Sequence, residues 1–323
     1  MLFPYLTLMI TLAQVICAKN ILLTNDDSWV STNIRATYRE LTLAGHNVVL
    51  VAPVSQRSGY GGKFDIPKGN VLQTNGEFDY VKAGEPAWGH EVDDQNVWYF
   101  NGTPASCVAF ALKYVLPKFF NNMTIDLVVS GPNEGTNMGQ GFYTGLGTMG
   151  ATYNSIYRGI PGVAFSGSNS NNSFFKDSLN TDPMNPSNIY ASKVVEFVAQ
   201  IFKSQGENPN ALPITSGINV NFPPVGNQDT TCTDPEWVLT RMSGELSATF
   251  DMAYNETSNT FVWSPASYKA LTVCENGDCS LPSANEVLTQ NCRTAVSVFS
   301  IDYDAKLELA NEVKALVQPI LSI

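Results

Sequence analysis

Two adjacent aspartates, Asp26 and Asp27, are the strongest candidates for chemistry in this sequence. They follow an apolar run at 21–23, and no lysine or arginine lies near them in the chain. Two neighbouring carboxylates repel each other unless a cation lies between or beside them. A hard cation such as magnesium or manganese prefers oxygen ligands. Capping of the following helix is the alternative, but a cap needs one side chain, and Asn25 adds a third polar group.

Two further polar loops follow buried strands expected at 48–53 and 125–130. The first, 55–62, is rich in glycine and contains Arg57 and Ser58; the second, 130–139, contains Asn133 and Asn137. In an open parallel sheet, ligands bind beyond the carboxyl ends of the strands, so we expect all three loops to meet at one edge. Each loop alone is equally compatible with a plain glycine-rich turn, and Arg57 either holds a phosphate or faces water.

The helix expected at about 148–158 begins near Gly147 and Thr148, so its positive N-terminus can face a phosphate. The pattern is not a Walker A loop, because the required Gly-Lys-Ser/Thr is absent. The two histidines, His46 and His90, are weak candidates, and no Ser/His/Asp set is evident. Any catalysis must therefore be centred on a metal.

The elements that position these loops alternate between strand and helix. The first strand, a helix at 31–44 and the strand at 48–53 form a βαβ unit, which indicates an α/β fold with a parallel sheet. The interruption at 54–100 contains two alternating stretches, 79–82 and 97–100, that we expect to form hairpin strands. Further helices are expected at 104–119, 189–204 and 304–317, and further strands at 162–167 and 214–221. After residue 223 the pattern changes to short β stretches.

Composition limits the partners. The chain has 323 residues and a net charge of −11, so it does not attract nucleic-acid polymers or acidic membrane surfaces. Residues 1–18 carry no charge and predict a signal peptide, hence a secreted protein. An uncleaved anchor or a buried helix is the alternative, although a membrane span needs about 20 apolar residues.

In a secreted protein the cysteines are expected to form disulfides. Cys274 and Cys279 flank an Asn-Gly turn and predict a local disulfide; Cys232 and Cys292 are candidates for a second, which leaves Cys107 as an odd buried thiol. Zinc is the alternative, but the paired Cys-x-x-Cys spacing is absent. Glycosylation sequons begin at four asparagines, of which the first is expected to stay bare: Asn101, Asn122, Asn171 and Asn255.

Four runs, in this order, resemble the SurE family of survival-protein phosphatases, in its secreted fungal branch. They are ILLTNDD at 21–27, VAP at 51–53 with RSG at 57–59, NGTPASC at 101–107, and DLVVSGPNEGTN at 126–137. The resemblance covers roughly 19–222 and implies a three-layer sandwich with a mostly parallel Rossmann-like sheet and β-hairpin extensions. We accordingly expect a signal peptide at 1–18 and one SurE-like domain at 19–323, with a core at 19–222 and an extension at 223–323.

The resemblance also implies an activity and a site. The activity is that of a metal-dependent phosphomonoesterase acting on nucleoside monophosphates or related phosphate esters, assembled as a homodimer with exchanged C-terminal β elements. The implied ligands of one divalent ion, magnesium or manganese, are Asp26, Asp27, Ser58 and Asn133. Phosphate contacts are implied for Asn25, Asn137 and the turn formed by Gly147 and Thr148. Departures are found at Leu146, at Asn154, in an apparent insertion at 82–96 and in the C-terminal region.

The resulting hypothesis is that the metal binds a phosphate oxygen and activates water. Backbone amides from Gly135 through Thr136 to Asn137, together with the helix end at Gly147, stabilise the developing charge. Direct attack by water and prior transfer of the phosphoryl group to an aspartate are both compatible with the sequence. Two other functions are also compatible: a secreted nucleotide- or glycan-binding protein that has lost catalysis, and a metal-dependent hydrolase of a different ester.

Overall fold

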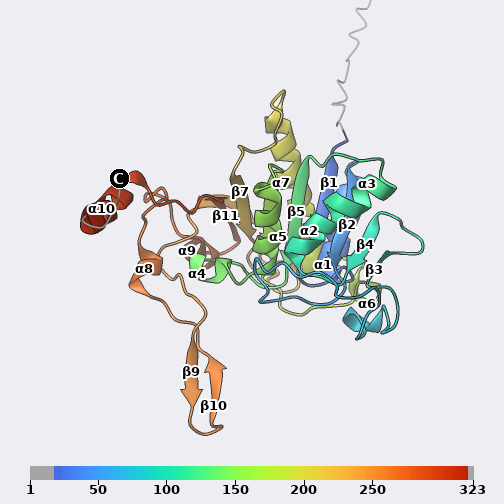
Figure 1. The fold of residues 1–323 in the computed structure, drawn as a ribbon, viewed down its shortest axis with the longest axis horizontal. Helices are drawn as coiled ribbons and strands as arrows, with labels where there is room; N and C mark the ends of the chain where they lie inside the picture. Colours follow the sequence, from blue (N-terminus) through green and yellow to red (C-terminus); the bar gives the residue numbers. More distant parts are fainter. Residues whose placement is uncertain (1–17, 319–323) are drawn as a thin grey trace, which may run out of the picture.

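The fold is an α/β sandwich built on one nine-stranded sheet, seen in the computed structural model of Figure 1, which describes residues 18–318. The signal peptide expected at 1–18 therefore lies outside the described residues, except for Ala18. The sheet has the order β3-β4-β2-β1-β5-β6-β7-β11-β8. Its strands are β1 Asn20–Thr24, β2 Asn47–Pro53, β3 Trp88–His90, β4 Val97–Phe100, β5 Leu127–Asn133, β6 Gly162–Ser166, β7 Ser216–Asn221, β8 Glu236–Thr240 and β11 Arg293–Ser300.

The central strands are parallel from β4 through β7, whereas β3 and β11 pair antiparallel with β4 and β7. Helices cover both faces of the sheet, as Figure 1 shows. The longer helices are α1 Thr32–Leu43, α2 Pro104–Phe110, α5 Gly147–Ile156, α7 Pro186–Gln205 and α10 Leu307–Val317, and shorter ones are α3 Leu116–Phe119, α4 Gln140–Tyr143, α6 Phe175–Ser178, α8 Lys269–Thr272 and α9 Ala284–Leu288. This arrangement confirms the expected three-layer, mostly parallel fold.

The side chains of β1 point alternately to the two faces of the sheet, and this explains the three layers. Ile21 and Leu23 pack with Ile34 of α1 and Val194 of α7, whereas Leu22 packs into a second cluster with α2 and the turns after it. All three β1 side chains are fully buried. Successive side chains of a strand point to opposite faces, so an unbroken apolar run is what a strand covered on both sides requires.

The expected helix at 104–119 is present, although it is built from α2, a π-type segment Ala111–Val115 and α3. The expected hairpin strand at 97–100 is β4, which pairs antiparallel with β3. The expected strand at 79–82 is wrong. Phe78 and Asp79 have positive φ angles and belong to the short 3-10 turn Glu77–Asp79, and Tyr80 packs its ring against Trp29.

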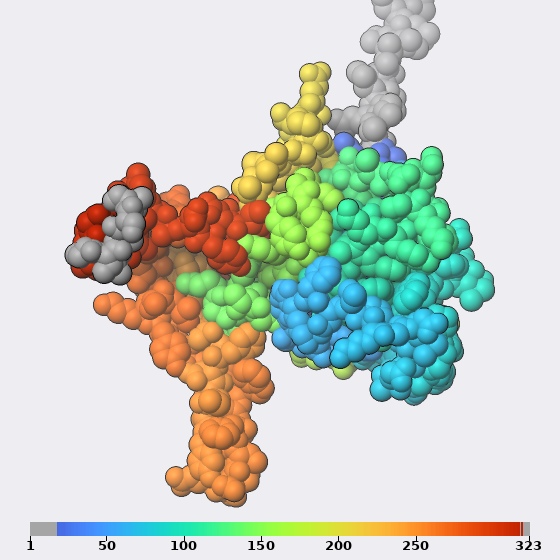
Figure 2. Space-filling model, in the orientation of Figure 1, coloured from blue at the N-terminus to red at the C-terminus, as the bar shows by residue number. Residues whose placement is uncertain are grey.

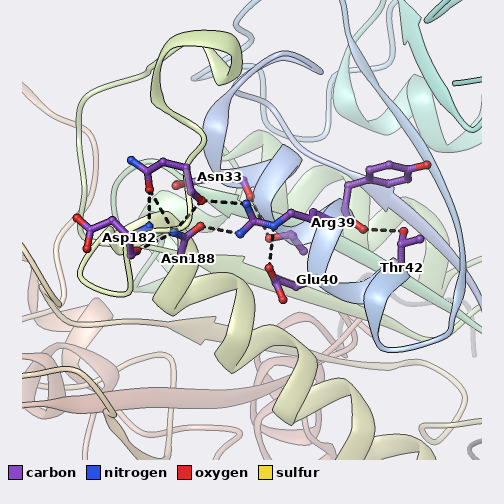
Figure 3. A network of polar contacts seen from close by, with 9 residues as sticks. Asn33, Arg39, Glu40, Thr42, Asp182 and Asn188 are labelled. Carbon is purple, nitrogen blue, oxygen red and sulfur yellow. Dashed lines mark hydrogen bonds and ion pairs between the residues drawn. The ribbon is translucent and has the colours of Figure 1, made fainter. Parts of the chain in front are cut away.

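The long polar loop at 168–185 is fixed against α1 and so reaches the carboxyl end of the sheet. Figure 3 shows Arg39 at the centre of this contact, where its guanidinium donates to the Asn180 carbonyl and to Asn188 Oδ1 at 3.0 and 2.8 Å. Nearer the sheet, Asn33 donates to Asn169 Oδ1 at 3.1 Å. The loop is thereby held beside the residues that follow β1.

The C-terminal region adds β11 and β8 to the sheet beyond β7, and two disulfides cross-link it: Cys232–Cys292 and Cys274–Cys279. Both pairings agree with the sequence prediction, and Cys107 is a free, buried thiol. The region also carries a hairpin of β9 Met252–Asn255 and β10 Thr260–Trp263, which projects away from the sheet in Figures 1 and 2. Between residues 18 and 318, the longer helices are not apolar enough to cross a membrane.

Candidate metal and phosphate site

The candidate site lies where the order of the sheet reverses. From β1 the chain adds β2 and β4 on one side, and β5, β6 and β7 on the other. Asp26 and Asp27 leave the carboxyl end of β1, and Asn133 is the last residue of the neighbouring β5. The loop after β2 joins them, because the Arg57 backbone N–H donates to the Asp26 carbonyl at 2.7 Å. The structure therefore brings the three polar loops to one edge, as topology requires.

The Asp27 carboxylate connects the two other loops. Its Oδ2 accepts from the Glu134 backbone N–H at 2.7 Å, and its Oδ1 accepts from Gln56 Nε2 at 3.1 Å. Burial raises the pKa of Asp27 well above its ordinary value, and the neighbouring Asp26 charge raises it further. A bound cation reverses both effects, so this carboxylate is suited to ligation.

The Asp26 carboxylate lies at the N-terminus of α5. Its Oδ1 accepts from Thr148 Oγ1 at 2.6 Å, and it also accepts backbone hydrogen bonds from Gly147 and Thr148. Burial raises the pKa of Asp26, while these hydrogen bonds act in the opposite direction. The aspartates therefore do not cap the helix that follows them, because the N-cap of α1 is Ser31. Asp26 instead contacts the positive N-terminus of α5, a helix far along the chain.

Several oxygens around the pair are buried and, within residues 18–318, have no hydrogen-bond donor. They include Asn133 Oδ1 and Asn25 Oδ1. Burial raises the pKa of Glu134 to about 7. Buried acceptors without donors are costly unless a cation or water satisfies them. Two carboxylates and an amide oxygen form the hard, oxygen-only donor set that magnesium and manganese take.

The ion pairs of the described chain do not involve these acidic groups. Nor do the described residues contain a cluster of three His, Cys, Asp or Glu side chains suited to a metal. Any metal here must accordingly combine the aspartates with amide and hydroxyl oxygens. The oxygens of Asp26, Asp27 and Asn133 fit a divalent cation of the hard class.

Ser58, the expected hydroxyl ligand, is exposed in this structure. Its Oγ accepts from Gln56 Nε2 at 2.8 Å, and the same amide group donates to Asp27. Gln56 thus links the hydroxyl to the carboxylate, and its backbone N–H donates to Glu77 Oε2 at 2.8 Å. Sequence reasoning did not select Gln56; its only signal was its position two residues before Ser58.

The expected phosphate-contacting residues lie around the same edge, but several of their donors are engaged. Asn137 Nδ2 donates to Thr148 Oγ1 at 3.1 Å, and the Asn137 carbonyl accepts from Asn219 and Asn221. Asn25 Nδ2 donates to the Ser28 carbonyl and to Ser31 Oγ. Gly135 has a φ of +97°, and Thr136 is exposed.

Arg57 turns its side chain away from the aspartates. Its Nε and Nη2 donate to the Gly102 carbonyl and to Asn101 Oδ1 at 3.2 and 3.1 Å. Other residues that sequence reasoning missed are Glu134, described above, and Asn172, whose Nδ2 donates to the Asp27 carbonyl at 3.3 Å. Asn172 lies in the loop fixed by α1, and its sequence gives no local indication of that contact.

Fold and site together define a doubly wound α/β protein with an oxygen-rich candidate cation site at its switch point. The model of the family "Survival protein SurE" matches residues 21–248, and the chain belongs to that family. The chain is 44% identical over 299 residues to an acid phosphatase of Yarrowia lipolytica, covering 92% of this chain and 83% of that protein.

Bacterial members are more distant. The chain is 30% identical over 208 residues to the 5′-nucleotidase SurE of Protochlamydia amoebophila, and this match covers 63% of each protein. The chain therefore spans less than two thirds of that nucleotidase. The crystal structure of the SurE protein from Aquifex aeolicus superposes with a TM-score of 0.58 at 22% identity, covering 92% of this chain and 99% of that one. This likeness concerns the fold.

Proposed function

We propose that this SurE-family chain is a metal-dependent phosphomonoesterase that releases phosphate from nucleoside monophosphates or related esters. Its class, a phosphoric monoester hydrolase, is supported by the acid phosphatase and 5′-nucleotidases to which it is similar. The observation that carries the proposal is the meeting of Asp26, Asp27 and Asn133 at the switch point, where the described residues supply no hydrogen-bond donor to Asn133 Oδ1. One divalent ion, magnesium or manganese, is the cofactor that these oxygens suit.

The ligands we propose for this ion are Asp26, Asp27, Ser58 and Asn133. A bound divalent cation supplies Lewis-acid polarisation of a phosphoryl oxygen and activation of water. Asp26 is held in place by the N-terminus of α5, and Asp27 by the N–H of Glu134. Ser58 is exposed, and its Oγ shares the Gln56 amide group with the Asp27 carboxylate.

Phosphate recognition is proposed for donors on the same edge: Asn25, Gly135, Thr136, Asn137, Gly147 and Thr148. Their role is to hold the phosphoryl oxygens and stabilise charge that develops on them. Gly135 supports this role because its positive φ turns the chain sharply after β5. Arg57 is proposed to bind the substrate on the side away from Asp26, where its guanidinium lies against Asn101.

The test is phosphate release from 5′-AMP and from an aryl phosphate, with magnesium, with manganese and with a chelator. We expect activity only with metal, and a loss of at least about 100-fold in Asp26→Ala. Asp93→Asn is the matched control, because Asp93 is an exposed aspartate in the 82–96 loop. Equal rates with chelator would refute the metal mechanism. Nucleotide binding without phosphate release over hours would instead identify a binding protein.

We also propose that the protein is secreted and glycosylated, with a signal peptide at 1–18 and one domain at 19–323. The two disulfides support an oxidising environment. Asn122, Asn171 and Asn255 are exposed, whereas Asn101 is partly buried and bonded to Arg57. Glycans are therefore expected on the first three alone, which peptide mass spectrometry after enzymatic deglycosylation would show.

A homodimer is proposed on the basis of the projecting hairpin. All residues of β9 and β10 are exposed, including Met252, Phe261 and Trp263. With Phe250 they line a shallow hollow of about 440 Å³. An isolated two-stranded hairpin is marginally stable in water, so an apolar one of this kind needs a partner surface. Light scattering of the full chain should give twice the monomer mass, and a monomer at micromolar concentration would refute the proposal.

A further inference from the structure

A cavity of about 620 Å³ lies beside the candidate metal site, beyond the carboxyl ends of β2 and β4. We call it the basic pocket and define it by Arg57, Tyr60, Lys63, Asp65, Lys68 and Asn101. The segment that forms most of its wall, 57–73, is coloured blue in Figure 2 and lies on the face shown there. Neither the metal ligands nor the proposed phosphate donors, other than Arg57, line this cavity.

The charge of the basic pocket is opposite to that of the protein. The chain as a whole has a net charge of −11, yet three cations line the pocket against one carboxylate. That carboxylate, Asp65, forms an ion pair with Lys63 at 2.7 Å. Within residues 18–318, Lys68 is exposed and has no carboxylate partner. A concentration of positive charge in an acidic protein favours an anionic ligand.

The pocket also has an organised interior. The Arg57 guanidinium is fixed by the Gly102 carbonyl and Asn101 Oδ1, and it has further N–H donors besides those used in these bonds. The Arg57 guanidinium and Lys63 Nζ lie 5.5 and 5.2 Å from the centre of the Tyr60 ring. The ring is 38% exposed, so it presents a flat apolar surface within a cationic frame.

One loop, which contains Arg57, joins the basic pocket to the candidate metal site. The Arg57 backbone N–H donates to the Asp26 carbonyl at 2.7 Å, while its side chain forms the pocket wall. The next residue, Ser58, is a proposed metal ligand. Arg57 therefore borders both the candidate metal site, through its backbone, and the basic pocket, through its side chain.

From this geometry we infer that the basic pocket binds a second phosphate on the leaving group. The preferred substrates are phosphate monoesters that carry another phosphate elsewhere, on a nucleoside or sugar whose ring lies against Tyr60. This inference rests on the proposed function. The reaction itself is hydrolysis: the bond between phosphorus and the ester oxygen breaks, water adds to phosphorus, and its proton passes to the departing alcohol.

The experiment compares adenosine 3′,5′-bisphosphate with 5′-AMP under the same metal conditions. We expect kcat/KM for release of the 5′-phosphate to be about tenfold higher for the bisphosphate, as one charge-assisted contact provides. The variant Lys68→Gln should lower the ratio of the two kcat/KM values toward one. Lys203→Gln, which removes an exposed lysine on α7, should leave the ratio at the wild-type value. Added salt should reduce the wild-type ratio, because exposed charges are screened.

A binding measurement separates this inference from the proposed function. With chelator present, calorimetry should show tighter binding of the bisphosphate than of 5′-AMP by wild-type protein, and this difference should be lost in Lys68→Gln. Phosphate release with equal kcat/KM for both substrates would overturn the pocket inference and leave the phosphatase standing. Absence of phosphate release, together with selective bisphosphate binding, would overturn the phosphatase and leave the pocket. Equal binding of both ligands to both proteins would overturn the pocket inference.

Discussion

Replacing Asp27 by asparagine tests metal binding and folding stability separately. The Asp27 carboxylate favours metal binding, but it destabilises the metal-free fold. In the metal-free protein Asp27 is buried next to Asp26, with Glu134 and Glu77 also raising its pKa. The metal-free fold must either hold two like charges together or keep a proton on Asp27. Two unit charges roughly 5 Å apart repel by about 3 kcal/mol at an effective dielectric constant of about 20, and this is the upper limit of the cost, because protonation avoids the repulsion. Asp27→Asn removes this cost and keeps the side-chain volume. We therefore expect the metal-free variant to be more stable than the wild type.

The substitution also removes one hydrogen bond, but this loss of stability is smaller than the gain. The asparagine oxygen keeps the hydrogen bond from the Glu134 N–H, but its NH₂ group faces Gln56 Nε2, which loses an acceptor. That loss amounts to about 1 kcal/mol. The net gain in the free energy of unfolding is therefore at most about 2 kcal/mol, which for a chain of this size raises the melting temperature by up to roughly 3 °C.

Thermal denaturation with chelator and with manganese measures both effects. The wild type should gain about 2.7 kcal/mol at a metal concentration about 100 times Kd, whereas the variant should gain almost nothing at that concentration. Asp93→Asn should behave as wild type in both conditions, because it removes an equal but exposed charge. The reasoning is refuted if the metal-free Asp27 variant melts below the wild type and still shows the full manganese shift.

Three further outcomes are expected. In chelator, the free energy of unfolding should fall as pH rises from about 4.5 through 7, because burial raises the pKa of Glu134 to about 7 and the folded state holds a proton that the unfolded chain has released. The Glu134 share of this loss, taken from urea titrations as the difference between wild type and Glu134→Gln, should be at most about 3 kcal/mol. Gly147→Ala should reduce kcat by roughly 100-fold, since its Cβ would lie 2.7 Å from Asp26 Cβ. Alanines at both Cys232 and Cys292, which are 60 residues apart, should lower the free energy of unfolding by about 4 kcal/mol.

Each of these outcomes has a matched comparison. The pH dependence should flatten when saturating manganese is present, and an unchanged slope would argue against a cation near Glu134. Gly62→Ala meets no atom within 4 Å of its Cβ and should keep wild-type kcat; equal losses in the two glycine variants would remove the steric argument. Removal of the short Cys274–Cys279 bridge, 5 residues apart, should cost about half as much as removal of the long one.

The sequence predicted the core of the fold because its strands are buried on both faces and so form continuous apolar runs. β1 and β5 are of this kind, and their polar ends identified the switch point. The strand predicted at 79–82 was wrong because apolar and polar residues also alternate in a turn that buries individual side chains. Here the turn buries Val81 and partly buries Tyr80. Local pattern cannot distinguish these cases, since burial depends on distant partners such as Trp29.

The same distinction applies to the site. Asp26, Asp27 and Asn133 could be selected because they directly follow or end buried strands. Gln56, Asn172 and the contact between Asp26 and Thr148 could not, because they depend on long-range packing: the last pair is 122 residues apart in the sequence. Such contacts form only when a loop is held over the edge of the sheet by contacts elsewhere, as α1 holds the loop at 168–185.

The two aspartates differ in how their charges are compensated. This difference indicates which of them needs a metal ion in order to be ionised. Asp26 receives the N-terminal N–H groups of α5 and the Thr148 hydroxyl, so the fold itself stabilises its ionised form. Asp27 receives one backbone and one side-chain N–H, yet it lies among other carboxylates. Hydrogen bonds thus offset part of the burial that raises the pKa of Asp26, whereas Asp27 depends more on a cation for its ionisation. Metal affinity should therefore follow the deprotonation of Asp27 more closely than that of Asp26.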